Sequence, residues 1–137
     1  MISYLNDDTT PVEFQFKATS LNNMGFVYQN LNQYKKAIPY FQKGLEQKND
    51  LLLYKPFVYA ILLDNLGYSR FKTNEPSALP ELFYESLKIR DSLQLTTGVI
   101  ISQLHLSEYF ESKGDFAKAL QYSNEALATA RKSKNRR

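Results

Sequence analysis

The chain contains the stretch LNNMGFVY at residues 21–28, and a related stretch, LDNLGYSR, lies at residues 63–70. A third copy, QLHLSEYF, lies at residues 103–110. The first two copies share a leucine, an asparagine, a glycine and an aromatic residue at equivalent places, and the third keeps a small residue and an aromatic one. The copies begin about 40 residues apart, and a sequence that matches itself at a spacing of this size is typical of helical repeat proteins.

A second block follows each copy at a similar distance. The blocks YKKAIPYF at residues 34–41 and FAKALQYS at residues 116–123 resemble each other, and LPELF at residues 79–83 is the divergent middle member. In both kinds of block the apolar residues recur at intervals of three and four, which is the period of one face of an α-helix. The sequence therefore predicts three hairpins of two helices each.

Capping residues indicate where several helices begin and end. Thr10-Pro11-Val12-Glu13 is typical of a helix start, with a threonine cap and a proline at the first position. Asn74-Glu75-Pro76 is expected to start the fourth helix, and turns are predicted at Asn32-Gln33 and Lys113-Gly114-Asp115. These signals predict a flexible segment at 1–10, a domain at 11–133 with hairpins at about 11–49, 50–92 and 93–133, and a basic tail at 134–137.

Small residues mark the predicted contact between the two helices of a hairpin. Gly25, Gly67 and Ser107 occupy equivalent places on the first helices, and Ala37 lies on the facing side of the second helix. Side chains this small allow the two backbones to approach closely. Leu79 stands where the other copies have alanine, so the middle hairpin is expected to be splayed or shifted.

Composition and charge exclude several classes of protein. The chain has no cysteine, which excludes disulfides and thiolate metal sites and leaves the compartment open between cytoplasm and periplasm. Its longest apolar run, Phe57–Leu63, is far shorter than the roughly 20 residues that span a bilayer, so direct membrane insertion is not expected. Five of the 17 basic residues lie at 131–137, and the other 12 face 14 acidic residues. A mildly acidic body without a basic stripe does not favour nucleic acid.

The pattern resembles the tetratricopeptide repeat, which pairs an apolar-Gly-x-x-Tyr first helix with an Ala-x-x-x-Phe-x-x-Ala second helix. The resemblance covers about residues 11–133. It implies an all-α, right-handed solenoid of about six helices that binds a protein or peptide without catalysis or a cofactor. The first copy carries the pattern through Leu21, Met24, Gly25, Tyr28, Ala37 and Phe41.

The spacing of this chain exceeds the family's usual repeat of about 34 residues. Helices longer than those of the usual repeat would account for the difference. Longer repeats of this kind resemble those in bacterial signalling proteins, including sensor regions of two-component kinases. An alternative function is therefore a sensory or regulatory domain that acts through ligand binding or self-association. A homodimer through a terminal hairpin is one form of such self-association.

The resemblance also implies where a partner would bind. In the family the first helices line a concave face, on which asparagines hold the backbone of an extended peptide, since an amide both donates and accepts hydrogen bonds. Aromatic side chains beside them can anchor apolar groups. The alternative is that these side chains stabilise neighbouring helices or are buried between repeats. The candidate partner-binding residues are Asn22, Asn23, Phe26, Asp64, Asn65, Tyr68, His105 and Glu108.

Candidates for catalysis or metal binding are few. The single histidine, His105, has Glu108 three residues further on, but a metal site usually needs three or four protein ligands and no third is indicated. Carboxylate pairs such as Glu81 with Glu85 are more typical of a solvated helix face than of an acid–base couple. We therefore expect no enzymatic activity, no metal and no cofactor.

Overall fold

The computed structural model describes residues 11–135 of the chain, and the side chains from residue 16 onward. This part of the chain is helical and contains no strand. Its helices are α2 (Pro11–Asn30), α3 (Tyr34–Leu45), α4 (Lys48–Tyr54), α5 (Pro56–Lys72), α6 (Glu81–Ser92), α7 (Thr96–Ser112) and α8 (Phe116–Asn135).

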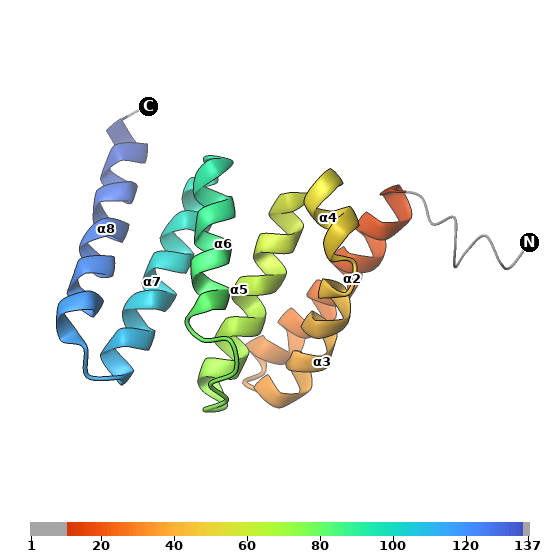
Figure 1. Cartoon of the computed structure of the whole chain (residues 1–137), viewed down its shortest axis with the longest axis horizontal. Helices are drawn as coiled ribbons and strands as arrows, with labels where there is room; N and C mark the ends of the chain where they lie inside the picture. Colours follow the sequence, from red (N-terminus) through yellow and green to blue (C-terminus); the bar gives the residue numbers. More distant parts are fainter. Residues whose placement is uncertain (1–10, 136–137) are drawn as a thin grey trace, which may run out of the picture.

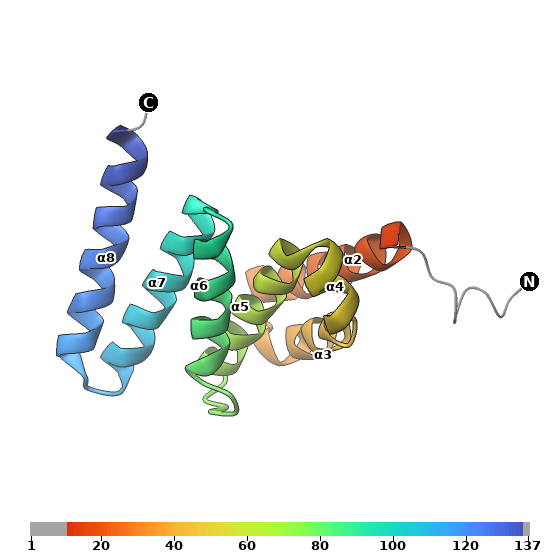
Figure 2. The same cartoon turned by 45° about the horizontal axis from the view of Figure 1, so that its top comes forward.

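The hairpins follow one another in chain order, from α2 at one end of the molecule to α8 at the other (Figures 1 and 2). Each packs mainly against its neighbours in the chain, as α2 against α3, α5 against α6 and α7 against α8. Between hairpins, α5 packs against α3, and α7 against α6. Contacts limited to neighbours are those of a helical solenoid, so the predicted all-α solenoid is confirmed.

The structure has seven helices within the described residues where the sequence predicted about six. The additional helix arises because the second helix of the first hairpin is interrupted at Glu46-Gln47, which separates α3 from α4. When the first repeat is aligned with the third, α3 and α4 together cover nearly the same repeat positions as the uninterrupted α8. Helix α4 ends before Pro56 because the residue before a proline avoids the helical region, and Lys55 has the non-helical angles φ −144° and ψ 63°.

The helices differ in length, whereas the repeat spacing predicted helices longer than those of the usual repeat. Helices α5 and α7 have 17 residues each, but α3 and α6 have only 12. Asn74-Glu75-Pro76 does not start the fourth helix, because α6 begins at Glu81, after a turn and a cis Leu79–Pro80 peptide bond. The divergent middle block thus lacks the first turns of its helix, but its hairpin is not splayed at Gly67, where an added Cβ atom would lie 2.9 Å from the ring of Phe83.

The chain ends agree with the predictions only in part. The first helix begins at Pro11, as expected, while its predicted cap Thr10 and the segment 1–10 lie outside the described residues. Helix α8 continues to Asn135, so the first residues of the predicted basic tail are helical. Residues 136–137 lie outside the described part.

The first helices of the three hairpins end in the same way. At each end a residue with positive φ follows, and the next backbone N–H donates to the carbonyl oxygen five residues earlier, which closes the helix as a Schellman motif. The predicted turns at Asn32-Gln33 and Gly114 are confirmed by this geometry. The bonds are Gln33 N to Tyr28 O (2.8 Å), Glu75 N to Arg70 O (2.8 Å) and Asp115 N to Phe110 O (2.9 Å).

The core confirms the predicted close approach within hairpins. A Cβ atom added to Gly25 would lie 2.5 Å from the ring of Phe41, and one added to Gly67 would lie 2.9 Å from the ring of Phe83. The third hairpin has serines at both places, and Ser107 lies 2.6 Å from its equivalent partner through a hydroxyl hydrogen bond. Glycine is therefore needed where a phenylalanine ring fills the space between the helices.

Candidate functional site

A groove of about 540 Å³ crosses the first helices of the hairpins, α2, α5 and α7. Seven of the eight residues predicted to bind a partner line it, and the eighth, Glu108, is exposed on α7 outside the lining. The fold brings these residues together because equivalent positions of stacked repeats face the same side. The lining residues are Asn22, Asn23, Phe26, Gln29, Ile61, Asp64, Asn65, Tyr68, Arg90, Ile101 and His105.

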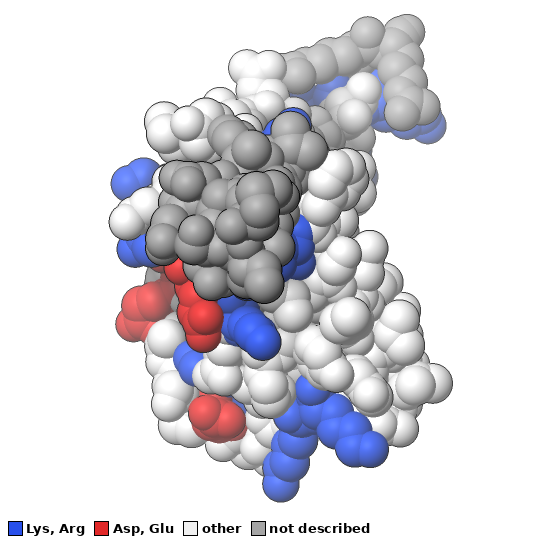
Figure 3. Space-filling view, turned by 90° about the vertical axis from the view of Figure 1, so that its right-hand side faces the viewer, with Lys and Arg blue, Asp and Glu red and all other residues white. Residues whose placement is uncertain are grey.

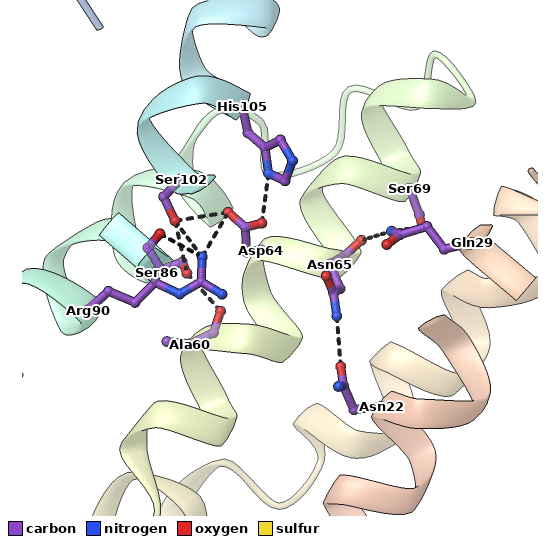
Figure 4. A network of polar contacts seen from close by, with 11 residues as sticks. Asn22, Gln29, Ala60, Asp64, Asn65, Ser69, Ser86, Arg90, Ser102 and His105 are labelled. Carbon is purple, nitrogen blue, oxygen red and sulfur yellow. Dashed lines mark hydrogen bonds and ion pairs between the residues drawn. The ribbon is translucent and has the colours of Figure 1, made fainter. Parts of the chain in front are cut away.

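Three side-chain amides link the first and second hairpins beside the groove. Asn65 Nδ2 donates to Asn22 Oδ1 over 2.9 Å, and the Gln29 amide donates to the backbone oxygen of Asn65 and to the hydroxyl of Ser69 (Figure 4). One half of each asparagine amide is used in this bond. Among the described residues, Asn22 Nδ2 and Asn65 Oδ1 have no hydrogen-bond partner, which leaves one donor and one acceptor beside the groove.

An aromatic layer links the second and third hairpins. The ring of Tyr68 stacks on the imidazole of His105, with 4.3 Å between ring centroids. The ring of Tyr34 packs edge-on against the Tyr68 ring, with 6.2 Å between centroids. The Lys72 ammonium lies 5.6 Å from the centre of the Tyr68 ring. Burial, followed by the negative charge of Glu108, raises the pKa of Tyr68, so its hydroxyl stays neutral and can donate a hydrogen bond.

A buried polar network lies beneath the groove, between α5, α6 and α7 (Figure 4). Asp64 is 1% exposed, and its Oδ1 accepts a hydrogen bond from Ser102 over 3.0 Å. Arg90 Nη1 lies 3.7 Å from the same oxygen and donates to Ser102 Oγ and to the Gly98 carbonyl. Burial lowers the pKa of Arg90, and the charge of Asp64 opposes this effect. The pair keeps both charges inside the protein by satisfying each with hydrogen bonds.

His105 connects this network to the groove. Its Nδ1 lies 2.7 Å from Asp64 Oδ2, but the atoms are not aligned as a hydrogen bond, so the contact is an ion pair whenever the ring is protonated. The ring also packs against Phe83, with 5.5 Å between ring centroids. His105 is thus held on three sides, by Asp64, Tyr68 and Phe83.

The predicted residues divide into exposed and structural groups. Asn23 and Glu108 are exposed, and Phe26 is 46% exposed, so their side chains are open to a partner. Asp64 lies in the groove floor with its carboxylate bound to neighbouring helices, and therefore positions other residues. Asn65 has both roles, since one side of its amide is used and the other is open.

Sequence reasoning missed the partners of Asp64. Arg90 follows Phe83 and Ser86 on one stripe of α6, and all three are buried. A charged residue on a stripe that faces the core was the signal in the sequence that could have indicated a buried ion pair. Ser102 occupies the repeat position of Leu62, and both are fully buried. A polar residue at a core position indicates a buried partner, but the sequence alone does not say which one.

The described residues contain no group of histidine, cysteine or acidic side chains that could hold a metal ion. Within the same range, no helix combines the length and the apolar character that crossing a membrane requires. The groups at the groove are amides, aromatic rings and a buried ion pair. Such groups are suited to holding a ligand by hydrogen bonds and apolar contact.

Comparison with known proteins bears on the first hairpin. The family model of the tetratricopeptide repeat matches residues 18–50, which include most of α2 and all of α3. No curated protein matches the chain. Tetratricopeptide repeats are non-catalytic scaffolds that generally mediate protein–protein interaction. The match over residues 18–50, together with the solenoid of helical hairpins, supports a tetratricopeptide repeat domain.

Proposed function

We propose that the chain is a non-catalytic module that binds an extended segment of another polypeptide in the groove across α2, α5 and α7. The observation that carries the proposal is the convergence of seven repeat-related residues in one groove. The proposal places the partner on the predicted concave face of the first helices. The partner is a protein or peptide.

The groove chemistry favours a peptide backbone with apolar side chains. The open donor of Asn22 and the open acceptor of Asn65 match the N–H and C=O groups of an extended chain. Phe26, Ile61 and Ile101 offer apolar contact beside them. Among the described lining residues the only lysine or arginine is Arg90, and it is bound to internal groups. The groove therefore suits neutral and apolar segments better than acidic ones.

A random library of short peptides, displayed on phage and selected on the purified chain, would test this function. A selected peptide is then titrated against the Asn23→Ala, Asn65→Ala double variant by fluorescence anisotropy. Loss of the exposed Asn23 amide and of the open Asn65 acceptor, both in the groove lining, should raise Kd at least tenfold, which corresponds to about 1.4 kcal/mol. Asn124→Ala, an exposed position on α8 outside the groove, is the matched control and should leave Kd unchanged.

Thermal unfolding of both variants by circular dichroism separates lost binding from lost folding, because Asn65 also bonds to Asn22. The proposal is wrong if no peptide is enriched, or if selected peptides bind the folded double variant as tightly as the original chain.

A second candidate is a sensory or regulatory domain of a bacterial two-component signalling protein that acts through self-association, such as a homodimer through a terminal hairpin. The observation that favours self-association is the exposed apolar surface of α8, where Phe116, Leu120 and Leu127 are 67%, 63% and 49% exposed. The signalling assignment itself rests on the length of the repeat. Light scattering over a range of concentrations tests self-association, which a 15.9 kDa monomer at every concentration would exclude.

A further inference from the structure

We infer that the two ends of the solenoid are complementary, so that α2 of one copy docks on α7 and α8 of a second copy, head to tail. The inference builds on the second candidate function, from which it takes only the premise that the chain self-associates. It adds the two faces, their polarity and the consequence that association is open-ended. The grounds are the interfaces that the chain already builds between its own hairpins.

The internal interface recurs at equivalent positions. Gly44 of α3 faces Leu62 of α5, since a Cβ atom added to this glycine would lie 2.9 Å from the leucine side chain. The equivalent pair one repeat later is Ser86 of α6 and Ser102 of α7, whose hydroxyl oxygens lie 3.5 Å apart. The chain therefore packs the first helix of one hairpin onto the preceding hairpin twice, in the same register.

Helix α2 carries the outer half of this interface without a partner among the described residues. Met24 is 50% exposed, whereas its equivalents Leu66 and Leu106 are 4% and 0% exposed. Phe16 is 65% exposed, and its equivalent Val58 is 6% exposed. Val27 continues the stripe along the helix, and Leu31 lies in the turn directly after it; their exposures are 57% and 58%. These four residues, Phe16, Met24, Val27 and Leu31, form what we name the α2 face.

The opposite end carries the other half. A groove of about 600 Å³ on α7 and α8 is lined by Leu104, Ser107, Glu108, Glu111, Phe116, Ala119, Leu120 and Ser123, which we name the α8 face. The equivalent residues of the first hairpin, in the same order, are Asn22, Gly25, Phe26, Gln29, Tyr34, Ala37, Ile38 and Phe41.

Several of those equivalent residues hold α5 in place. Asn22 and Gln29 hydrogen-bond to α5, and the ring of Tyr34 meets Tyr68 of α5. Ile38 is 9% exposed, whereas its equivalent Leu120 is 63% exposed. The α8 face therefore corresponds to the surface of the first hairpin on which α5 docks, and a first helix of another copy can dock there. Three described helices, α2, α5 and α7, are the first helices of their hairpins, and α2 is the one of these whose docking face is open.

Figure 3 looks onto the α2 end, and uncharged residues make up most of the right-hand part of the surface that it shows. Within residues 16–135, exposed apolar side chains remain at both ends, whereas the terminal repeats of solenoids normally have a polar outer face. Because the two faces differ, each added copy leaves one face of each kind open, so association continues beyond a dimer.

The test uses one variant for each end. Met24→Glu with Val27→Glu disables the α2 face, and Leu120→Glu with Leu127→Glu disables the α8 end; all four side chains are exposed, so both variants should fold. Leu93→Glu, an exposed leucine after α6, is the control. Circular dichroism and thermal unfolding check the fold of each.

By light scattering, the unaltered chain and the Leu93→Glu control should grow past twice the 15.9 kDa monomer mass as concentration rises. Each end variant alone should remain monomeric. An equimolar mixture of the two should form a species of twice the monomer mass and no larger, because one good face of each kind remains. Association of a single end variant by itself would show like-with-like pairing, which overturns the head-to-tail inference but keeps self-association. A monomer in every sample would overturn both.

A cross-link provides a second readout, since the chain has no cysteine. Gln29 and Ser69 bond to each other across the first internal interface, 3.0 Å apart, and the equivalent residues of two docked copies are Glu111 and Val27. The Glu111→Cys and Val27→Cys variants, mixed and treated with a short bismaleimide, should give a cross-linked dimer. Replacing Val27→Cys by Leu93→Cys should abolish it. Equal cross-linking of both pairs would contradict the docking register.

Discussion

Gly25 packs against the ring of Phe41 so closely that a single added carbon would collide with it. The same relation recurs between Gly67 and Phe83. The third hairpin changes both members, and its two serines share a hydrogen bond in the space that a ring would fill. At the scale of residues, each hairpin is therefore specified by a pair, a small residue on the first helix and the side chain that it faces on the second. The reason for either residue is clear only when its partner is known.

Gly25→Ala should destabilise the protein, although alanine favours a helix over glycine by about 1 kcal/mol. The new Cβ would lie 2.5 Å from the Phe41 ring, and overpacking of this kind costs about 1–3 kcal/mol. Urea denaturation measures the loss. The cost should shrink in a Phe41→Leu background, which removes the ring, and a stabilising Gly25→Ala would show that the ring moves freely.

Arg90→Met should be among the costly single changes in the chain. It leaves the carboxylate of Asp64 buried without its cation, and breaking a buried pair in this way costs about 3–5 kcal/mol. Lys88→Met, an exposed position on the same helix, is the matched control and should change stability little. Equal free energies of unfolding for the two variants would mean that the network contributes nothing.

At the scale of elements, the helix ends follow one rule with different residues. After α2, α5, α6 and α7 a residue with positive φ turns the chain, and these residues are Asn32, Asn74, Gln94 and Gly114. Glycine adopts this conformation without cost, and asparagine tolerates it better than most residues. Glutamine has neither advantage, so Gln94, with φ 56°, stores strain at the end of α6.

Gln94→Gly should therefore stabilise the protein by roughly 0.5 kcal/mol, because relief of the left-handed conformation, worth about 1–2 kcal/mol, is partly offset by the greater freedom of glycine in the unfolded chain. The midpoint of urea unfolding should rise with an unchanged slope. Asn32→Gly serves as the comparison and should shift the midpoint less, whereas a lower midpoint for Gln94→Gly would refute the assignment of strain.

At the scale of the whole molecule, burial is concentrated at the centre of the solenoid. Helix α5 contacts the first hairpin on one side and α6 and α7 on the other, and nine of its residues are buried. Helix α8 contacts α7 and buries only Ala119 and Ala126. Since local stability follows buried contacts, opening should begin at the ends.

Hydrogen exchange at low protein concentration should show this gradient directly. Backbone amides of α5 are expected to exchange slowest, and those of the last turns of α8 fastest. Protection of α8 should increase with concentration if the α2 face of another copy covers it. Protection of α8 equal to that of α5 in dilute monomer would contradict the gradient.

The internal match between three copies was sufficient to predict an all-α solenoid of hairpins, the contacts at Gly25 and Gly67, and the turns at Asn32 and Gly114. These features depend on local periodicity and on steric limits of one or two residues, which a sequence records directly. Together with the family resemblance, the same match indicated residues that would share one face of the three first helices, and seven of these eight line one groove, since equivalent positions of a stacked repeat face the same side.

Only the tertiary structure decided how those residues are used. The sequence did not predict the interruption between α3 and α4 or the start of α6 at Glu81. Asp64 has the same repeat place as Asn22, yet it is buried because Arg90 and Ser102, distant in the chain, neutralise and bond its carboxylate. A single sequence does not show such pairings, since the free energy of a buried charge depends on which groups the fold brings within a few ångströms of it.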